Sequence, residues 1–162
     1  MIKIKLAGKE FDYYWKIMKI PLIVLVVWAL LGFFVSLFSY ATYQTVFSNI
    51  AGTVLIIIIF GFIGWTTVKD YKGTVKMGAW AGVLTGLIYG FIGGIIGILM
   101  INLVPDVTTD ALARATAQGA SVEMIQSFIR IGAYLGLIIG PIINAIIGAV
   151  ISAIGALIAK KV

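Results

Sequence analysis

Four long apolar stretches, almost free of charged residues, set the limits on what this chain can fold into. They cover about residues 21–43, 46–68, 77–103 and 125–159. Each is long enough for the roughly 20 apolar residues that a helix needs to cross a bilayer. Because 62% of all residues are hydrophobic and only 11% are charged, a water-soluble fold could not bury so much apolar surface. We therefore predict an all-α integral membrane protein, a four-transmembrane-helix bundle that forms a single membrane domain.

The segment before the first apolar stretch is basic. It contains the lysines Lys3, Lys5, Lys9, Lys16 and Lys19. Large apolar side chains recur there at helical spacing, at Phe11, Tyr14, Trp15 and Met18, which is typical of an amphipathic helix. We predict a short N-terminal helix over residues 1–19 that lies in the membrane interface, with its lysines on anionic lipid headgroups.

The positions of the basic residues predict how the chain crosses the membrane. All ten lysines lie in the N-terminal segment, in the turn between the second and third stretches, and at the C-terminal end, whereas the outer segments contain only Arg114 and Arg130. Because Lys and Arg gather in cytoplasmic loops, we expect a cell-membrane protein with both termini in the cytoplasm and residues 104–124 outside. In that outer loop we expect Asp110 to cap a short helix, and Ser121 to cap the last transmembrane helix.

Two rows of small residues, each with four-residue spacing, distinguish the third and fourth stretches. The glycines of these rows are Gly78, Gly82, Gly86, Gly90 and Gly94 in the third stretch and Gly132, Gly136, Gly140 and Gly148 in the fourth. Small residues let helix backbones approach closely in lipid, so we predict glycine-zipper packing of these two helices. The rows could pack against each other within one chain or against another copy. The first two stretches are bulkier and are expected to face lipid.

Four neutral polar residues fall at similar depths in the predicted helices: Ser36, Thr53, Tyr89 and Asn144. They could form one polar layer near the bilayer midplane. Pro141 cannot donate a backbone hydrogen bond to the carbonyl of Leu137 and is expected to kink its helix beside Asn144. Such a broken helix can form a binding site in transporters, but the Asn144 amide could equally supply a hydrogen bond that joins two helices.

The side chains that most enzymes and metal proteins use are missing. The sequence has no histidine and no cysteine, which excludes thiolate and imidazole metal sites and nucleophile–base pairs built on these residues. The last stretch is longer than a bilayer needs, so its first turns, with Arg130, are expected outside the membrane or in the headgroups. No ionisable side chain then falls inside a predicted hydrocarbon core, where proton relays and ion-coupled carriers normally need one. We therefore expect no enzyme, no cofactor and no metal, and the basic segment lacks the fold of a nucleic-acid reader.

These observations favour a structural or accessory subunit, or a scaffold, in a membrane assembly. Its partners would be membrane lipids and either further copies of the chain or other membrane proteins. The main alternative is an oligomeric pore or carrier for a neutral solute, centred on Asn144 and the kink at Pro141. A third possibility is lipid handling through the basic N-terminal helix.

Overall fold

The computed structural model describes residues 5–117, 119 and 121–162 and is built almost entirely of helices. Within these residues, four helical segments are long and apolar enough to cross a membrane. They are α1 (Phe11–Phe38), the segment Tyr40–Lys69, α4 (Val75–Leu103) and α6 (Val122–Lys161). The predicted helical bundle with four segments of membrane-spanning length is confirmed.

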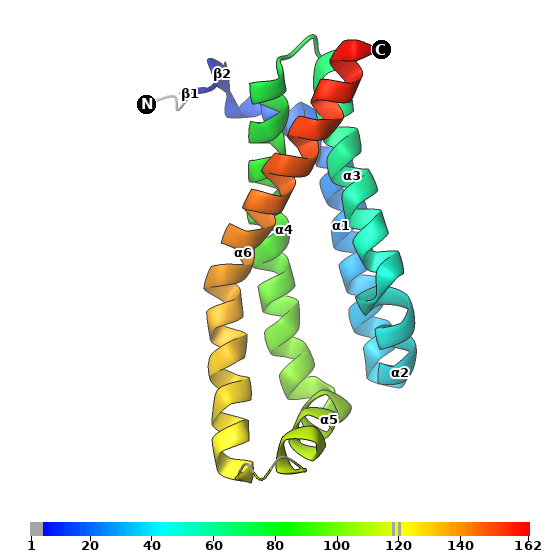
Figure 1. The fold of residues 1–162 in the computed structure, drawn as a ribbon, viewed down its shortest axis with the longest axis vertical. Coiled ribbons are helices and arrows are strands. Elements are labelled where there is room, and N and C mark those ends of the chain that lie inside the picture. The colour runs from blue at the N-terminus through cyan, green and yellow to red at the C-terminus, as the bar shows by residue number, and fades with distance from the viewer. Residues whose placement is uncertain (1–4, 118, 120) are drawn as a thin grey trace.

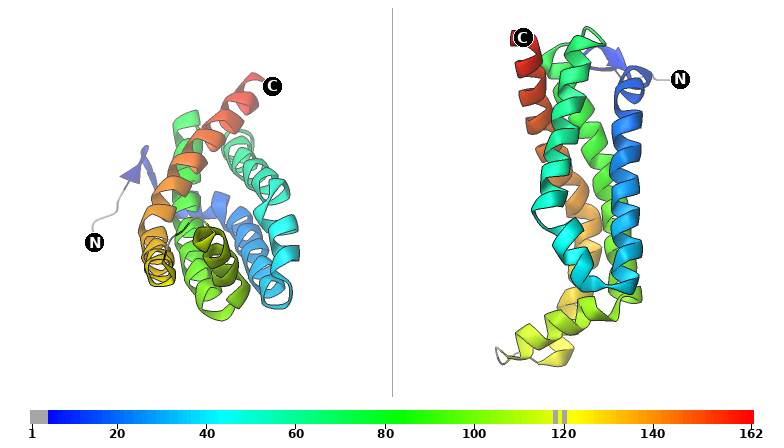
Figure 2. Two further views of the ribbon diagram at one scale, coloured as in Figure 1. Left: turned by 60° about the horizontal axis from the view of Figure 1, so that its bottom comes forward. Right: turned by 90° about the vertical axis from the view of Figure 1, so that its right-hand side faces the viewer.

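The bundle has two distinct ends (Figure 1). The N-terminal segment, the turn between α3 and α4, and the C-terminus lie together at one end, which we call the lysine end because every described lysine lies there or within the first three turns of α1. The turn after α1 and the short helix α5 (Pro105–Thr116) lie at the opposite end, which we call the α5 end. Figure 2 shows α5 running across the bundle axis, beyond the ends of α1 and α3.

The N-terminal segment differs from the prediction. Residues 5–10 form a β-hairpin, in which β1 (Lys5–Leu6) pairs antiparallel with β2 (Lys9–Glu10). Ala7 and Gly8 form the two-residue turn with φ of 47° and 84°, the positive values that a type I′ hairpin turn requires. The helical residues 11–19 are the first turns of α1, which continues past Pro21. The predicted separate interfacial helix is therefore wrong, and Lys3 lies outside the described residues.

Hydrogen bonds from two tyrosine hydroxyls join the segments at the lysine end to one another. Tyr14 is fully buried, and its hydroxyl donates a 2.6 Å hydrogen bond to the carbonyl of Leu6 in the hairpin. Tyr71, in the turn between α3 and α4, donates a 3.0 Å hydrogen bond to the carbonyl of Lys16 in α1. The hairpin and this turn are therefore both attached to the first helix.

The second spanning segment is three helical pieces in succession. These are α2 (Tyr40–Tyr43), the π-helical turn η1 (Gln44–Ser48) and α3 (Ile50–Lys69). The chain turns at Ser39, whose side chain accepts a hydrogen bond from the backbone N–H of Thr42. The first helix thus ends at Phe38 rather than at residue 43, and residues 44–45, between the first two predicted stretches, are helical.

The outer connection is also only partly as predicted. The helix α5 begins at Pro105, which lacks the backbone N–H that would have no hydrogen-bond partner in the first turn of a helix. Asp110 therefore lies inside this helix, and the prediction that it caps one is wrong. Ser121 accepts a hydrogen bond from the N–H of Met124 and caps α6, as predicted. The helix α6 continues unbroken through Pro141, and its ribbon changes direction near the middle, in its orange part.

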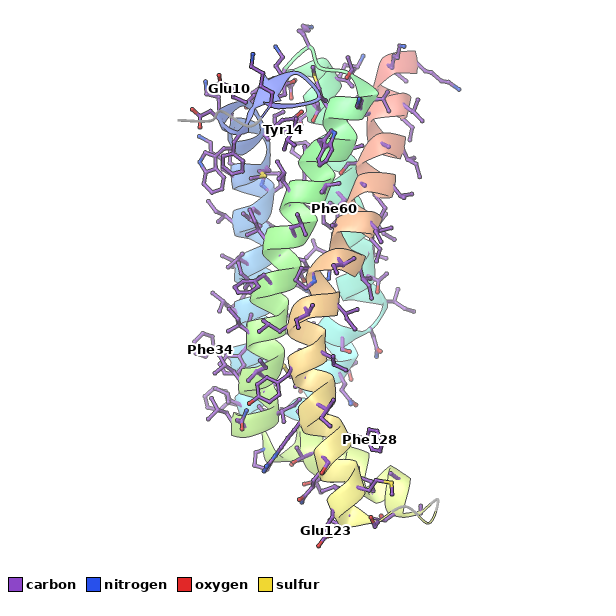
Figure 3. The ribbon with its side chains drawn as sticks, turned by 90° about the vertical axis from the view of Figure 1, so that its left-hand side faces the viewer. Glu10, Tyr14, Phe34, Phe60, Glu123 and Phe128 are labelled. Carbon is purple, nitrogen blue, oxygen red and sulfur yellow. The ribbon has the colours of Figure 1, made fainter. Side chains whose placement is uncertain are left out.

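The main core lies in the half of the bundle toward the lysine end. Its largest buried side chains come from α1 and α3, among them Tyr14, Leu25, Phe60 and Ile63. Figure 3 shows Phe60 inside the bundle and Phe34 pointing away from it. Large apolar side chains such as Phe34, which is 55% exposed, cover the outer surface, as expected for helices that have lipid as their solvent.

Candidate functional site

The glycine row of α4 faces α6 along its whole length. A Cβ atom added at any of its five glycines would lie 3.0 Å or less from an atom of α6. At Gly90 the nearest such atom is the Cα of Pro141, at 2.6 Å, and at Gly94 it is the Cα of Leu137, at 2.8 Å. No side chain other than hydrogen fits at these positions without moving one helix, so the row sets the distance between α4 and α6.

The row of α6 meets α4 along only part of its length. At Gly148 an added Cβ would overlap the carbonyl of Gly82, and at Gly140 it would lie 3.6 Å from the carbonyl oxygen of Gly90. At Gly132 and Gly136 it would meet nothing within 4 Å. The two outermost glycines of the row, Gly132 and Gly136, therefore face open space, although Leu137 beside them contacts Gly94 of α4.

The helix α3 packs against α6 as closely as α4 does. An added Cβ at Gly64 would overlap the carbonyl of Ser152, and one at Gly155 would overlap the carbonyl of Gly61. The buried hydroxyl of Ser152 donates a 2.8 Å hydrogen bond to the carbonyl of Phe60. One face of α3 therefore packs inside the bundle, while its other side, with Val54, Ile57 and Phe62 exposed, faces outward as expected. The sequence signal that we missed is that Gly61, Gly64 and Gly155 lie outside the four-residue rows.

The surface of this three-helix contact carries a shallow apolar groove. It has a volume of about 360 Å³ and is lined by Gly61, Phe62 and Trp65 of α3 and by Gly155 and Ile158 of α6. An added Cβ at Gly61 would meet nothing within 4 Å, so the groove is open at this glycine. We call these five residues the α3–α6 groove.

A larger hollow lies on the α5 side of the close contact, between α4 and α6 and beside α3. Its volume is about 410 Å³, and six of its lining residues are glycines, including Gly93, Gly97 and Gly136. Tyr89 and Asn144, both half-buried, line it as well. We call this space the glycine hollow. The structure thus brings two of the four predicted polar residues to one cavity.

The other two polar residues lie apart from this cavity. The Ser36 hydroxyl is buried and donates a 2.6 Å hydrogen bond to the carbonyl of Phe33 in its own helix, and Thr53 is exposed on the bundle surface. Asn144 donates from Nδ2 to the carbonyl of Gly140, 2.9 Å away in α6. This amide hydrogen bond stays within one helix and does not join two.

A polar hollow of about 280 Å³ lies at the α5 end and was not anticipated from the sequence. Three helices contribute its polar groups: Asn102 from α4, Thr108 from α5, and Gln126 and Arg130 from α6. Arg130 is exposed and forms no ion pair with any described residue. We call this space the Arg130 pocket. It was missed because its residues come together only through the folding of α5 across the bundle.

The lysines predicted to contact headgroups are exposed where the structure describes them. Lys5, Lys9, Lys16 and Lys19 all point to the surface of the lysine end. The ammonium group of Lys9 lies 5.3 Å from the centre of the Tyr13 ring, a cation–π distance. These side chains form a basic surface, but they surround no described cavity.

The described residues contain no group of three or more acidic, histidine or cysteine side chains that could hold a metal ion. No protein-family model, no curated protein and no solved structure matches the chain.

Proposed function

We propose that this protein is a non-enzymatic structural or accessory subunit of a membrane assembly. The observation that supports this best is the backbone contact of α3, α4 and α6, where glycines leave no room for a side chain. In lipid such contacts gain van der Waals attraction and weak Cα–H···O bonds without a hydrophobic driving force. The two helices α4 and α6 would then act as an intramolecular glycine zipper that gives the subunit a stiff body.

In this proposal the subunit carries both termini in the cytoplasm. The lysine end holds every described lysine, and the α5 end holds Asp106, Glu123 and Arg130. The positive-inside tendency therefore supports a cytoplasmic lysine end, where the basic surface would contact anionic headgroups, each lysine adding roughly 1 kcal/mol of attraction.

The surface proposed for subunit contact is the α3–α6 groove, and the proposed partner is a second copy of the chain. Gly61 lies eight residues before Lys69, about 12 Å along the helix from the lysine end, so the groove faces the hydrocarbon region in this orientation. Its open glycine is flanked by the bulky side chains of Phe62 and Trp65. A depression of this shape can receive a ridge of a neighbouring helix.

The test fills the groove with a side chain. Gly61→Leu places a large group in open space, so the fold should persist while the second copy is excluded. We expect chemical crosslinking in native-membrane particles to give oligomers for the unaltered protein and a strong loss for Gly61→Leu. The matched control is Gly93→Leu, which also enters open space but lies in the glycine hollow. Equal crosslinking of all three proteins would contradict this interface.

A second candidate function is a carrier or pore for a neutral solute. The observation that favours it is that Tyr89 and Asn144 line the same hollow, next to Pro141. A kinked helix with a nearby amide can bind solutes near the midplane. Because Ser36 and Thr53 lie apart from this cavity, the solute would have only these two polar side chains to contact.

A further inference from the structure

The glycine hollow and the Arg130 pocket lie next to each other between α4 and α6. Ile101 of α4 lines both of them. The pocket is polar and lies at the α5 end, whereas the hollow continues toward the middle of the bundle and is lined mostly by glycine and apolar residues. A molecule that fills both must therefore have a polar head and an apolar tail.

The length of this space matches one leaflet of a bilayer. Arg130, at its outer end, and Asn144, at its inner end, are 14 residues apart in α6, which is about 21 Å along a helix. Half of the hydrocarbon core is ~15 Å thick, and one headgroup layer adds ~5–8 Å. A lipid with its head at Arg130 would therefore reach Asn144 with the end of its acyl chain.

The chemistry of the Arg130 pocket selects an anionic head. The guanidinium group of Arg130 has no ion-pair partner among the described residues, and a guanidinium binds phosphate oxygens through paired hydrogen bonds. The amide of Gln126 offers a neutral donor in the same pocket, whereas the Thr108 hydroxyl already donates to the carbonyl of Pro105, 2.9 Å away. Glu123 lies two helical turns further out, at the tip of the bundle, as Figure 3 shows, and it does not line the pocket.

The glycines explain why an acyl chain fits beside α4 and α6. Gly93, Gly97 and Gly136 have open space where a side chain would project. Glycine inside a helix costs about 1 kcal/mol against alanine, so three open glycines around one hollow are not accounted for by helix packing. They keep space free between α4 and α6, and a Leu or Ile at any of these positions would fill that space.

From this geometry we infer that the chain binds one phospholipid with an anionic head from the leaflet at the α5 end. The phosphate lies in the Arg130 pocket, and one acyl chain lies in the glycine hollow and ends near Tyr89 and Asn144. This site is independent of the proposed subunit contact, because it shares no residue with the α3–α6 groove. It excludes a water-filled solute path, because the acyl chain occupies the same hollow.

Native mass spectrometry of the purified full-length protein tests this inference, with phosphatidylglycerol, phosphatidylcholine and inorganic phosphate as separate probes. For the unaltered protein we expect one retained phosphatidylglycerol, in clear preference to phosphatidylcholine. Arg130→Gln should lower retention of phosphatidylglycerol about tenfold, the effect of losing one charged hydrogen-bonding group. It should lower the weaker retention of phosphatidylcholine less, because the choline cation already neutralises that headgroup. Gly97→Leu and Gly136→Leu should lower retention of both lipids, because they fill the hollow.

Gly61→Leu is the matched control, since it adds the same side chain in open space outside this site. It should retain lipid like the unaltered protein even if it loses subunit contacts, so failure of the two proposals can be told apart. Circular dichroism checks the fold of each variant, and Gly97→Val repeats the test with a smaller side chain if a Leu variant unfolds. Full lipid retention by Arg130→Gln and by the hollow-filling variants would overturn the inference. Displacement of phosphatidylglycerol by inorganic phosphate alone would also overturn it, since the pocket would then be a simple anion site.

Discussion

Replacing glycine by alanine in α4 should destabilise the protein at Gly86 but not at Gly93. At Gly86 the three atoms nearest to an added Cβ are all backbone atoms of α6, including the carbonyl carbon of Asn144 at 2.5 Å and the Cα of Ala145 at 2.8 Å. Ordinary contacts begin at 3.4 Å, so the two helices must separate by roughly 1 Å, a gap that forfeits a quarter to a half of each contact. At Gly93, two turns further along α4, an added Cβ meets nothing within 4 Å.

The expected magnitudes follow from these two environments. Overpacking of a tight contact costs typically 1–3 kcal/mol, and the better helix propensity of alanine returns up to about 1 kcal/mol. Gly86→Ala should therefore lower the free energy of unfolding by ~1–2 kcal/mol. Gly93→Ala has the propensity gain without the overlap, so it should leave stability unchanged or raise it by up to ~1 kcal/mol.

The assay is equilibrium unfolding in mixed micelles, titrated with sodium dodecyl sulfate and followed by far-ultraviolet circular dichroism. The midpoint of Gly86→Ala should fall at a lower mole fraction of the denaturing detergent than that of the unaltered protein, and the midpoint of Gly93→Ala should not. Equal midpoints for the two variants would refute the claim that backbone contact between α4 and α6 limits the space at Gly86.

Two further predictions concern polar groups in the membrane-spanning region. Ser152→Ala removes the hydrogen bond to the Phe60 carbonyl and should lower the free energy of unfolding by ~0.6 kcal/mol, and at most ~1.7 kcal/mol, in the same micelle titration; an unchanged midpoint would show that this bond adds nothing. Asn144→Leu should leave the flux of small neutral solutes into liposomes at the level of protein-free vesicles, as for the unaltered protein, if a lipid fills the hollow. A flux in the unaltered protein that Asn144→Leu abolishes would instead favour the carrier.

The sequence predicted where the helices lie better than it predicted which helices pack against each other. Apolar length identified the four spanning segments, and the four-residue glycine row of α4 correctly indicated one small face, because helical periodicity fixes which residues share a face. Periodicity does not say what covers that face. The row of α6 continues to Gly132 without a break in the pattern, yet Gly132 and Gly136 face open space, while Leu137, which lies outside the row, contacts Gly94 of α4.

Each wrong or missed prediction has a physical cause that the structure shows. The N-terminal helix was predicted from aromatic spacing, but Ala7 and Gly8 adopt the positive φ of a hairpin turn and the buried Tyr14 hydroxyl holds the hairpin in place. The role of α3 was missed because the hydrogen bond from Ser152 to Phe60 joins residues 92 positions apart. The Arg130 pocket likewise depends on three helices, and no local pattern in the sequence relates them.

The oligomeric state in native lipid tests the central proposal of a membrane subunit most directly. The protein can be extracted from its own membrane into polymer-bounded lipid particles and weighed by mass photometry, with copurifying proteins identified by mass spectrometry. The proposal predicts particles that contain more than one copy of the chain or one copy with another membrane protein. Particles that contain a single copy and no other protein would contradict it.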